Sequence, residues 1–354
     1  MKNFMLLICT FCITVMLGLA SCEGDQGPIG PAGPEGPVGP AGPQGAQGEG
    51  TQNCVLCHGS SQLITAKQYQ WEHSVHATGG NNNHNQTNCA ICHTSQGFRE
   101  RIAAGTEVTA APIEDPLPIN CYTCHQIHTT YTDADWALTQ QQPVTLWVGG
   151  QTLDFGKANL CISCHQSRRY SPELPDPNTG GTVNIQTTRY GPHHGPQGVM
   201  LPGLNGYEVP GPVAYENSAH TLLLANNTQN ACVTCHMGYN SSAAAGGHTF
   251  RSVSEEGAIN TAACVACHPV AADLTALVAD RQAQIDAKLA ELEALLVARG
   301  LYNPANEQNT KGDFEGHEAG ALFNFKFVSE DKSGGVHNFK YAYALLSNSI
   351  AALQ

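Results

Sequence analysis

Cysteine and histidine recur in this chain at one fixed spacing that suits covalent attachment of a metal cofactor. The pentapeptide Cys-x-x-Cys-His occurs six times, at residues 54–58, 89–93, 121–125, 161–165, 232–236 and 264–268. The chain has 15 Cys and 16 His in 354 residues. Random order at this composition would give roughly 0.03 such pentapeptides. One copy is also compatible with half of a zinc site or a redox pair. Six copies that all end in histidine predict six covalently bound haem c groups.

In haem c attachment, two thiols add to the porphyrin vinyl groups and the adjacent histidine binds the iron. The predicted covalent anchors are Cys54, Cys57, Cys89, Cys92, Cys121, Cys124, Cys161, Cys164, Cys232, Cys235, Cys264 and Cys267. The predicted proximal iron ligands are His58, His93, His125, His165, His236 and His268. The remaining cysteines, Cys9, Cys12 and Cys22, lie near the N-terminus, so none is left for a structural disulfide.

Six other histidines are predicted to bind iron from the opposite, distal side. They are His76, His128, His193, His220, His248 and His337. His76 and His220 each end a Glu-x-Ser-x-His sequence that precedes an attachment motif by 12–13 residues. This internal repeat favours His76 over His73, which would instead be a neighbour on the helix face or a hydrogen-bond partner to a propionate. His193 is favoured over the adjacent His194 in a turn rich in Pro and Gly.

The remaining histidines are assigned from their local sequence. His125 and His128 would lie one turn apart on a short helix, so one could bind its own haem and the other a neighbouring haem. His337 follows a Gly-Gly pair where a closing helix is expected, which suits a distal ligand. His317 is expected to be a core or propionate contact, and His84 a loop residue.

The N-terminal segment predicts export and membrane anchoring. Residues 1–21 form a signal peptide that ends in Leu-Ala-Ser before Cys22, the pattern of a bacterial lipoprotein, so Cys22 is the predicted lipidation site. From residue 24 to residue 48 glycine recurs at every third position, with proline in many of the intervening positions. Residues 22–50 therefore read as a lipidated, collagen-like stalk. The stalk would either assemble a homotrimer or act as a stiff monomeric spacer.

The fold class predicted for the mature chain is mainly α with extensive loops, a haem-packed core and long C-terminal helices. Residues 51–270 form the hexahaem domain, with little regular structure, and residues 171–212 are expected to be a long ordered loop. Residues 271–354 form a C-terminal helical segment that carries one distal histidine. Within it, residues 271–299 have a narrow apolar seam, with Gly300 as a stop. The seam would pack on its own haem domain or form a subunit interface.

These features resemble the multihaem cytochromes c related to nitrite reductase and hydroxylamine oxidoreductase. The resemblance covers residues 51–354. It rests on Met237 directly after the fifth motif, on the Gly-Gly-His sequence at His248, and on the Gly-x-His-Asn sequence at His337 before the closing helix. It implies that His337 is a distal ligand. Nitrite reductases replace one proximal histidine by lysine, whereas all six motifs here end in histidine, which argues against nitrite reduction.

The ligand count favours an electron conduit over an enzyme. Six proximal and six distal histidines would close every iron, leaving no position for a substrate. The alternative is a reductase of a small nitrogen or sulfur oxyanion at one five-coordinate haem, with Arg168 and Arg169, or Arg99 and Arg101, as the cationic groups. The net charge of −13 argues against nucleic acid and anionic lipid surfaces. The expected partners are redox proteins or an extracellular acceptor, reached from a lipid-anchored, extracytoplasmic position in a bacterium.

Overall fold

The computed structural model describes residue 58 and residues 62–221, 231–239 and 244–354. The predicted signal peptide, Cys22, the stalk and the anchors Cys54 and Cys57 lie outside the described residues. Their assignments stay predictions.

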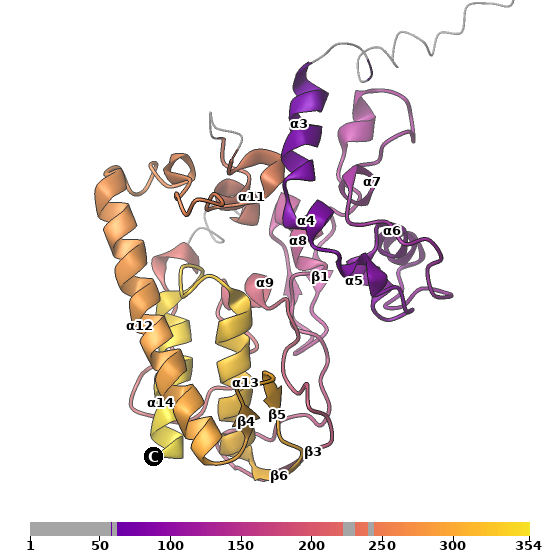
Figure 1. Ribbon diagram of the computed structural model, residues 1–354. Helices are drawn as coiled ribbons and strands as arrows, with labels where there is room; N and C mark the ends of the chain where they lie inside the picture. Colours follow the sequence, from indigo (N-terminus) through magenta and orange to yellow (C-terminus); the bar gives the residue numbers. More distant parts are fainter. Residues whose placement is uncertain (1–57, 59–61, 222–230, 240–243) are drawn as a thin grey trace, which may run out of the picture. The chain divides into compact units, whose positions relative to one another are not determined.

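Before residue 270 the described chain consists of short helices joined by long loops, as the sequence predicts (Figure 1). The helices are α3 (Gln62–Glu72), α4 (Val75–Thr78), α5 (Ala90–His93), α6 (Ser95–Ala104), α7 (Cys121–Cys124), α8 (Asn159–Ile162), α9 (Gln197–Met200) and α11 (Ala231–His236). Four of them, α5, α7, α8 and α11, contain cysteines of attachment motifs. The local helical turns therefore occur where the chain must present those cysteines.

Three longer helices follow: α12 (Ala271–Ala298), α13 (Gly316–Asp331) and α14 (Phe339–Leu353). The predicted helix over residues 271–299 is confirmed to within one residue. It stops at Gly300, whose φ of +72° is the left-handed conformation common just after a helix. The apolar seam of α12 is buried, with Ile285 and Leu292 fully inaccessible, and it packs against α13 and α14. The seam therefore packs within the chain, but chiefly against the C-terminal helices α13 and α14 and not, as expected, against the haem domain. Its buried residues are not free for a subunit interface.

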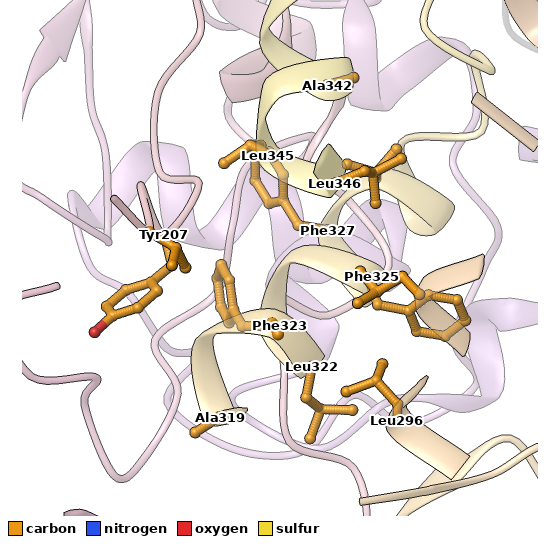
Figure 2. Close-up of a cluster of buried hydrophobic side chains, with 14 of the residues drawn as sticks. Tyr207, Leu296, Ala319, Leu322, Phe323, Phe325, Phe327, Ala342, Leu345 and Leu346 are labelled. Atoms are coloured by element: carbon orange, nitrogen blue, oxygen red, sulfur yellow. The ribbon is translucent and has the colours of Figure 1, made fainter. Parts of the chain in front are cut away.

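The main hydrophobic core is formed by these three helices together with buried residues of the chain before residue 270, such as Ile185 and, on α9, Val199 and Met200. Phe323 and Phe327 of α13 lie with Leu345 of α14 and Leu296 of α12 in one cluster of buried side chains (Figure 2). Burying a large apolar side chain contributes about 1.5–3 kcal/mol. This helical layer is therefore a stable base on which the irregular chain before residue 270 can be fastened.

The strands are short and form three two-stranded antiparallel pairs in the described chain. β1 (Val144–Thr145) pairs with β2 (Thr152–Leu153), β3 (Thr182–Ile185) with β6 (Gly312–Glu315), and β4 (Tyr302–Asn303) with β5 (Gln308–Asn309). The expectation that residues 171–212 are only loop is wrong, because β3 and α9 lie within them. The partner of β3 is more than 120 residues further along the chain, so local sequence could not indicate the strand.

Three buried asparagines on α13 and at α14 fasten the loop that leads to His220. The Asn324 side chain hydrogen bonds to both backbone groups of Tyr207, at 2.9 Å and 2.7 Å. Asn348 does the same with Val213, at 2.9 Å and 2.8 Å. A carboxamide can satisfy a backbone N–H and a C=O at once. The side chains of Asn324 and Asn348 thus bind the backbone of this loop as the backbone of a neighbouring β-strand would.

The third asparagine, Asn338, is fully buried and caps the start of α14. Its Oδ1 accepts a hydrogen bond from the Ser218 N–H at 2.9 Å, and its Nδ2 donates to Asn217 Oδ1 at 2.7 Å. The loop is therefore held two residues before His220.

Candidate functional site

Each described attachment motif forms a single helical turn. The histidine N–H donates to the carbonyl of the first cysteine at 3.1 Å from His93, 2.9 Å from His125, 2.9 Å from His165 and 2.8 Å from His268. A turn places positions i, i+3 and i+4 on the same side of the backbone. Both sulfurs and the imidazole therefore face one side, as a single flat cofactor requires.

Twelve histidine rings in the described chain meet in six pairs of similar spacing. The pairs and their ring-centroid distances are His58–His128 at 6.0 Å, His76–His165 at 6.2 Å, His93–His193 at 6.1 Å, His125–His248 at 6.3 Å, His220–His268 at 6.2 Å and His236–His337 at 6.1 Å. Each pair contains one predicted proximal and one predicted distal histidine. We number the sites 1–6 by their attachment motif in chain order.

These distances suit one iron between the two rings. A metal–imidazole bond of about 2.0–2.1 Å, with the bonded nitrogen about 1.1 Å from the ring centre, places two rings on opposite sides of one ion about 6.3 Å apart. Two other His–His contacts are too short for this arrangement: His84–His93 at 5.1 Å and His193–His194 at 4.9 Å. In this geometry His193, and not His194, faces His93.

The Glu-x-Ser-x-His repeat places its two histidines by different contacts. Ser74 is the N-cap of α4, accepting from the Ala77 N–H at 3.3 Å, and so presents His76 on the next turn. Ser218 instead accepts from the Lys340 N–H at 3.0 Å, which joins the residues before His220 to the start of α14. His76 faces His165 of site 4 and not the motif that follows it in sequence.

His125 and His128 do not share a helix, so that expectation is wrong. α7 ends at Cys124, and His128 has a φ of +61° in a turn. The buried Asp135 carboxylate holds this turn by accepting from the backbone N–H of His128 at 2.8 Å, of Thr130 at 2.6 Å and of Tyr131 at 3.1 Å. These local bonds stabilise a backbone conformation that a histidine seldom adopts.

His248 and His193 are also held through their backbones. Gln70 of α3 accepts from the His248 N–H at 3.0 Å, which ties residue 248 to α3. The Arg168 N–H donates to the Pro192 carbonyl at 3.0 Å. His193 therefore projects from a turn fastened to the residues just after the site 4 motif.

Six of the paired rings have a hydrogen-bond partner on Nδ1, which leaves Nε2 available for a metal. Nδ1 contacts a backbone carbonyl in His125 (Trp136, 2.7 Å), His220 (Val336, 2.7 Å) and His236 (Phe250, 2.9 Å). It contacts a side chain in His128 (Tyr122, 3.2 Å), His165 (Gln197, 3.1 Å) and His337 (Asp331, 2.6 Å). Such partners fix the tautomer and orientation of a metal-binding imidazole.

Burial keeps several of these rings neutral. Desolvation lowers the pKa of His76, His193 and His248 to about 4, with further lowering by His165, by Arg168 and by Lys67 respectively. The neutral imidazole is the form that coordinates metal. At pH 7 these three side chains are therefore in the protonation state that ligation requires.

The other histidines have different surroundings. His73 Nδ1 contacts the Tyr69 carbonyl at 2.8 Å, and His84 Nδ1 contacts the Asn81 carbonyl at 3.2 Å. His194 pairs with Glu330 at 3.0 Å, which raises the pKa of His194, although burial opposes the charge. His317 is half-buried near the start of α13.

The attachment motifs approach one another at their cysteines. The thiols of Cys92 and Cys164 lie close enough to shift each other's pKa, and so do those of Cys161 and Cys232. Sites 2, 4 and 5 therefore share a boundary at the positions where cofactors would be attached. Phe250 joins sites 3 and 4, because its ring lies 5.8 Å from His248 and 5.0 Å from His76.

A basic pocket of about 220 Å³ lies beside His193. Arg168, Arg169 and Arg189 line it together with Tyr170 and other polar residues. Arg169 also pairs with Glu107. Guanidinium groups suit carboxylates such as haem propionates as well as small oxyanions.

The donor set fits haem better than a bare metal ion. Among the described residues, no group of three or more His, Cys, Asp and Glu side chains is arranged to hold an ion. A structural zinc site would need four protein ligands. A haem iron needs only two, because the porphyrin supplies the other donors. Each ring pair offers two.

Sequence reasoning missed the residues that position the rings. Asp135 and Asp331 bind the backbone or ring of a paired histidine, and the buried asparagines fasten the loop before His220. The Gly-x-His-Asn sequence did draw attention to Asn338, but not to its contact with residue 218. Such contacts join segments that are distant in sequence.

Comparisons with known proteins agree with a multihaem c-type cytochrome. No family model matches the chain. The C-type polyheme cytochrome OmcB of Geobacter sulfurreducens, from either of two strains, is 25% identical over 240 residues, covering 56% of this chain and 31% of OmcB. The chain thus spans about a third of the length of these curated relatives. The crystal structure of outer cell wall cytochrome OcwA shares the fold, with a TM-score of 0.51 and 22% identity over 81% of this chain and 50% of OcwA.

These likenesses support a multihaem c-type cytochrome and imply covalently bound haem c as the cofactor. Neither likeness is to a nitrite reductase or a hydroxylamine oxidoreductase. None of the helices that the structure describes is long and apolar enough to cross a membrane.

Proposed function

We propose that this chain is a hexahaem electron conduit in which every iron is closed by two histidines. The six ring pairs, all spaced to hold one iron, are the observation that carries this proposal. Haem c supplies an iron that alternates between Fe(III) and Fe(II). With both axial positions taken by protein, the chain binds and orients the cofactor and excludes substrates from the metal.

The contacts between sites support a branched order. Sites 1 and 3 adjoin through His128 and His125, three residues apart, and Phe250 links site 3 to site 4. The two close pairs of thiols link site 4 to sites 2 and 5. The Val336 carbonyl, beside His337 of site 5, binds His220 of site 6. We infer the series 1–3–4–5–6, with site 2 as a side branch at site 4.

A cryo-EM structure of the holoprotein tests this order. The iron of site 2 should lie nearest to that of site 4. A nearest neighbour at any other site would refute the branch.

The setting of the conduit is also a proposal. The lipoprotein-like signal with Cys22 and the collagen-like stalk support a chain anchored outside the cytoplasm, where haem c is attached. OcwA is described as an outer cell wall cytochrome, which is consistent with this location. The partners would be redox proteins or an extracellular acceptor. A trimer through the stalk would be detected by sedimentation of the full chain against a variant lacking residues 24–48.

A reductase with one open haem is the competing function. The basic pocket beside His193 favours it, because three arginines at one site could bind a small oxyanion. It would require His193 to leave its iron. The 6.1 Å between the rings of His193 and His93 falls within the 6.0–6.3 Å range of the other pairs. This spacing supports a closed site 2 and a role for the arginines with propionates.

Carbon monoxide titration of the dithionite-reduced holoprotein separates the two functions. A closed conduit should show no change in the Soret band, and the oxidised protein should give only low-spin EPR signals. A change corresponding to about one haem in six, together with a high-spin signal, would refute the closed conduit. The variant His193→Ala provides the positive control, because it should open site 2 alone.

A further inference from the structure

Site 5 differs from the other sites in the group that binds its second ring nitrogen. Of the twelve paired rings, all within the described part of the chain, His337 is the only one with an Nδ1 contact to a carboxylate, Asp331 Oδ1 at 2.6 Å. Where the other paired rings have an Nδ1 partner, it is a backbone carbonyl, an amide or a hydroxyl group. A full negative charge thus reaches one ring.

Asp331 is built into the fold for this contact. It is the last residue of α13, and its side chain is 1% exposed. The Ser333 hydroxyl donates to its other oxygen, and the His337 N–H donates to Ser333 Oγ at 3.2 Å. The nearby Lys332 pairs with Glu330 instead. Among the described residues, no lysine or arginine forms an ion pair with Asp331.

The turn between α13 and α14 keeps this geometry rigid. Lys332, Gly334 and Gly335 have φ values of +60°, +58° and +90°, which reverse the chain within a few residues. Gly335 lies against α12, where an added Cβ would come within 2.8 Å of Ile285 Cγ1. The backbone and the packing therefore hold the carboxylate at hydrogen-bond distance from the ring.

We infer that Asp331 strengthens His337 as an electron donor and makes site 5 the site of lowest reduction potential among the six. A carboxylate on the outer nitrogen increases the basicity of a metal-bound imidazole. A more electron-rich ligand favours Fe(III) over Fe(II), and hydrogen bonding around the ligand is one means by which proteins tune haem potentials. Burial strengthens the effect because the charge is little screened.

The inference rests on the proposed function, because it requires iron at site 5. In the inferred order, a low reduction potential at site 5 makes electron transfer onto site 5, from site 4 or from site 6, thermodynamically unfavourable.

The test is an anaerobic spectroelectrochemical titration of the full-length holoprotein and its variants. Asp331→Asn, which is nearly isosteric, should move the lowest-potential component upward and leave the other five in place, with all EPR signals still low-spin. Ser333→Ala should move the same component downward, because Asp331 loses its competing hydroxyl donor. Asp331→Glu should restore most of the wild-type value.

Glu330→Gln is the matched control, since it removes a carboxylate one residue away that contacts His194 and Lys332 but no paired ring. It should leave the lowest component unchanged. The inference is overturned if Asp331→Asn does not move that component, or if Glu330→Gln moves it equally. If Asp331→Asn does not yield holoprotein, the Ser333→Ala variant decides. A downward shift of the lowest component supports the inference, and an upward shift or no shift overturns it.

A failure of the proposed function looks different. Wild-type protein would then bind carbon monoxide at site 5 or contain fewer than six haems, whatever the potentials of the variants.

Discussion

Replacing Asn338 by alanine should both destabilise the protein and open one haem. The side chain is fully buried and serves two structures at once, as the cap of α14 and as the anchor of the loop before His220. Losing an N-cap costs about 1 kcal/mol. Leaving the partly buried Ser218 N–H without its acceptor costs about 1–2 kcal/mol more. We therefore expect the free energy of unfolding to fall by roughly 2–3 kcal/mol.

The functional consequence follows from the position of residue 218. Ser218 lies two residues before His220. Loss of the Asn338 side chain removes its hydrogen bonds to the Ser218 N–H and to Asn217, and so loosens the attachment of this segment to α14. His220 should then leave its partner ring in part of the molecules. Reduced Asn338→Ala should bind carbon monoxide at about one haem in six, and the oxidised protein should gain a high-spin signal.

Asn348→Ala is the matched control. Asn348 is also fully buried on α14 and makes two hydrogen bonds to Val213, but it does not contact the residues next to His220. Guanidinium denaturation followed by far-ultraviolet circular dichroism should show a similar loss of stability, with all six haems still closed. Our reasoning is refuted if Asn338→Ala loses stability without opening a haem, or if Asn348→Ala opens one to the same extent.

Three further predictions concern single side chains elsewhere in the chain. Burial lowers the pKa of Lys326 to about 8 in the folded protein, whereas the pKa of a lysine in the unfolded chain is about 10.4. Between these two pH values the unfolded state binds more protons than the folded state, so the free energy of unfolding rises with pH. Lys326→Met should abolish this slope in pH-dependent denaturation, and an unchanged slope would contradict the assignment. Gly335→Ala should lower the free energy of unfolding by about 1–3 kcal/mol because of its φ of +90° and its contact with α12; a wild-type denaturation midpoint would argue against this strain. Asp135→Ala should release the turn that carries His128 and let carbon monoxide bind at site 1, whereas Asp133→Ala, on the same short 3₁₀ helix, should not.

Much of the local structure could be predicted because its causes are local. An attachment motif is one helical turn whose cysteines and histidine face the same side, whatever surrounds it. The helix over residues 271–298 follows from an apolar periodicity and a terminal glycine. The turn at His128 could not be predicted in this way, because its conformation depends on the carboxylate of Asp135 seven residues later.

The sequence by itself determined the composition of the sites. It singled out twelve histidines, six because each directly follows the second cysteine of an attachment motif and six because of their local sequence context. Iron ligation by these histidines stays a prediction. It could not pair them. His125 faces His248, and His76 faces His165 and not the motif that follows it.

Those pairings were decided only by the tertiary structure. The α13–α14 turn, the buried asparagines and strand β3 bring together segments that are far apart along the chain. The same is true of the contact between Asp331 and His337, which depends on a turn held against α12. The physical reason is that a covalent motif needs only its own residues, whereas two rings facing one iron need the whole packed fold to place them.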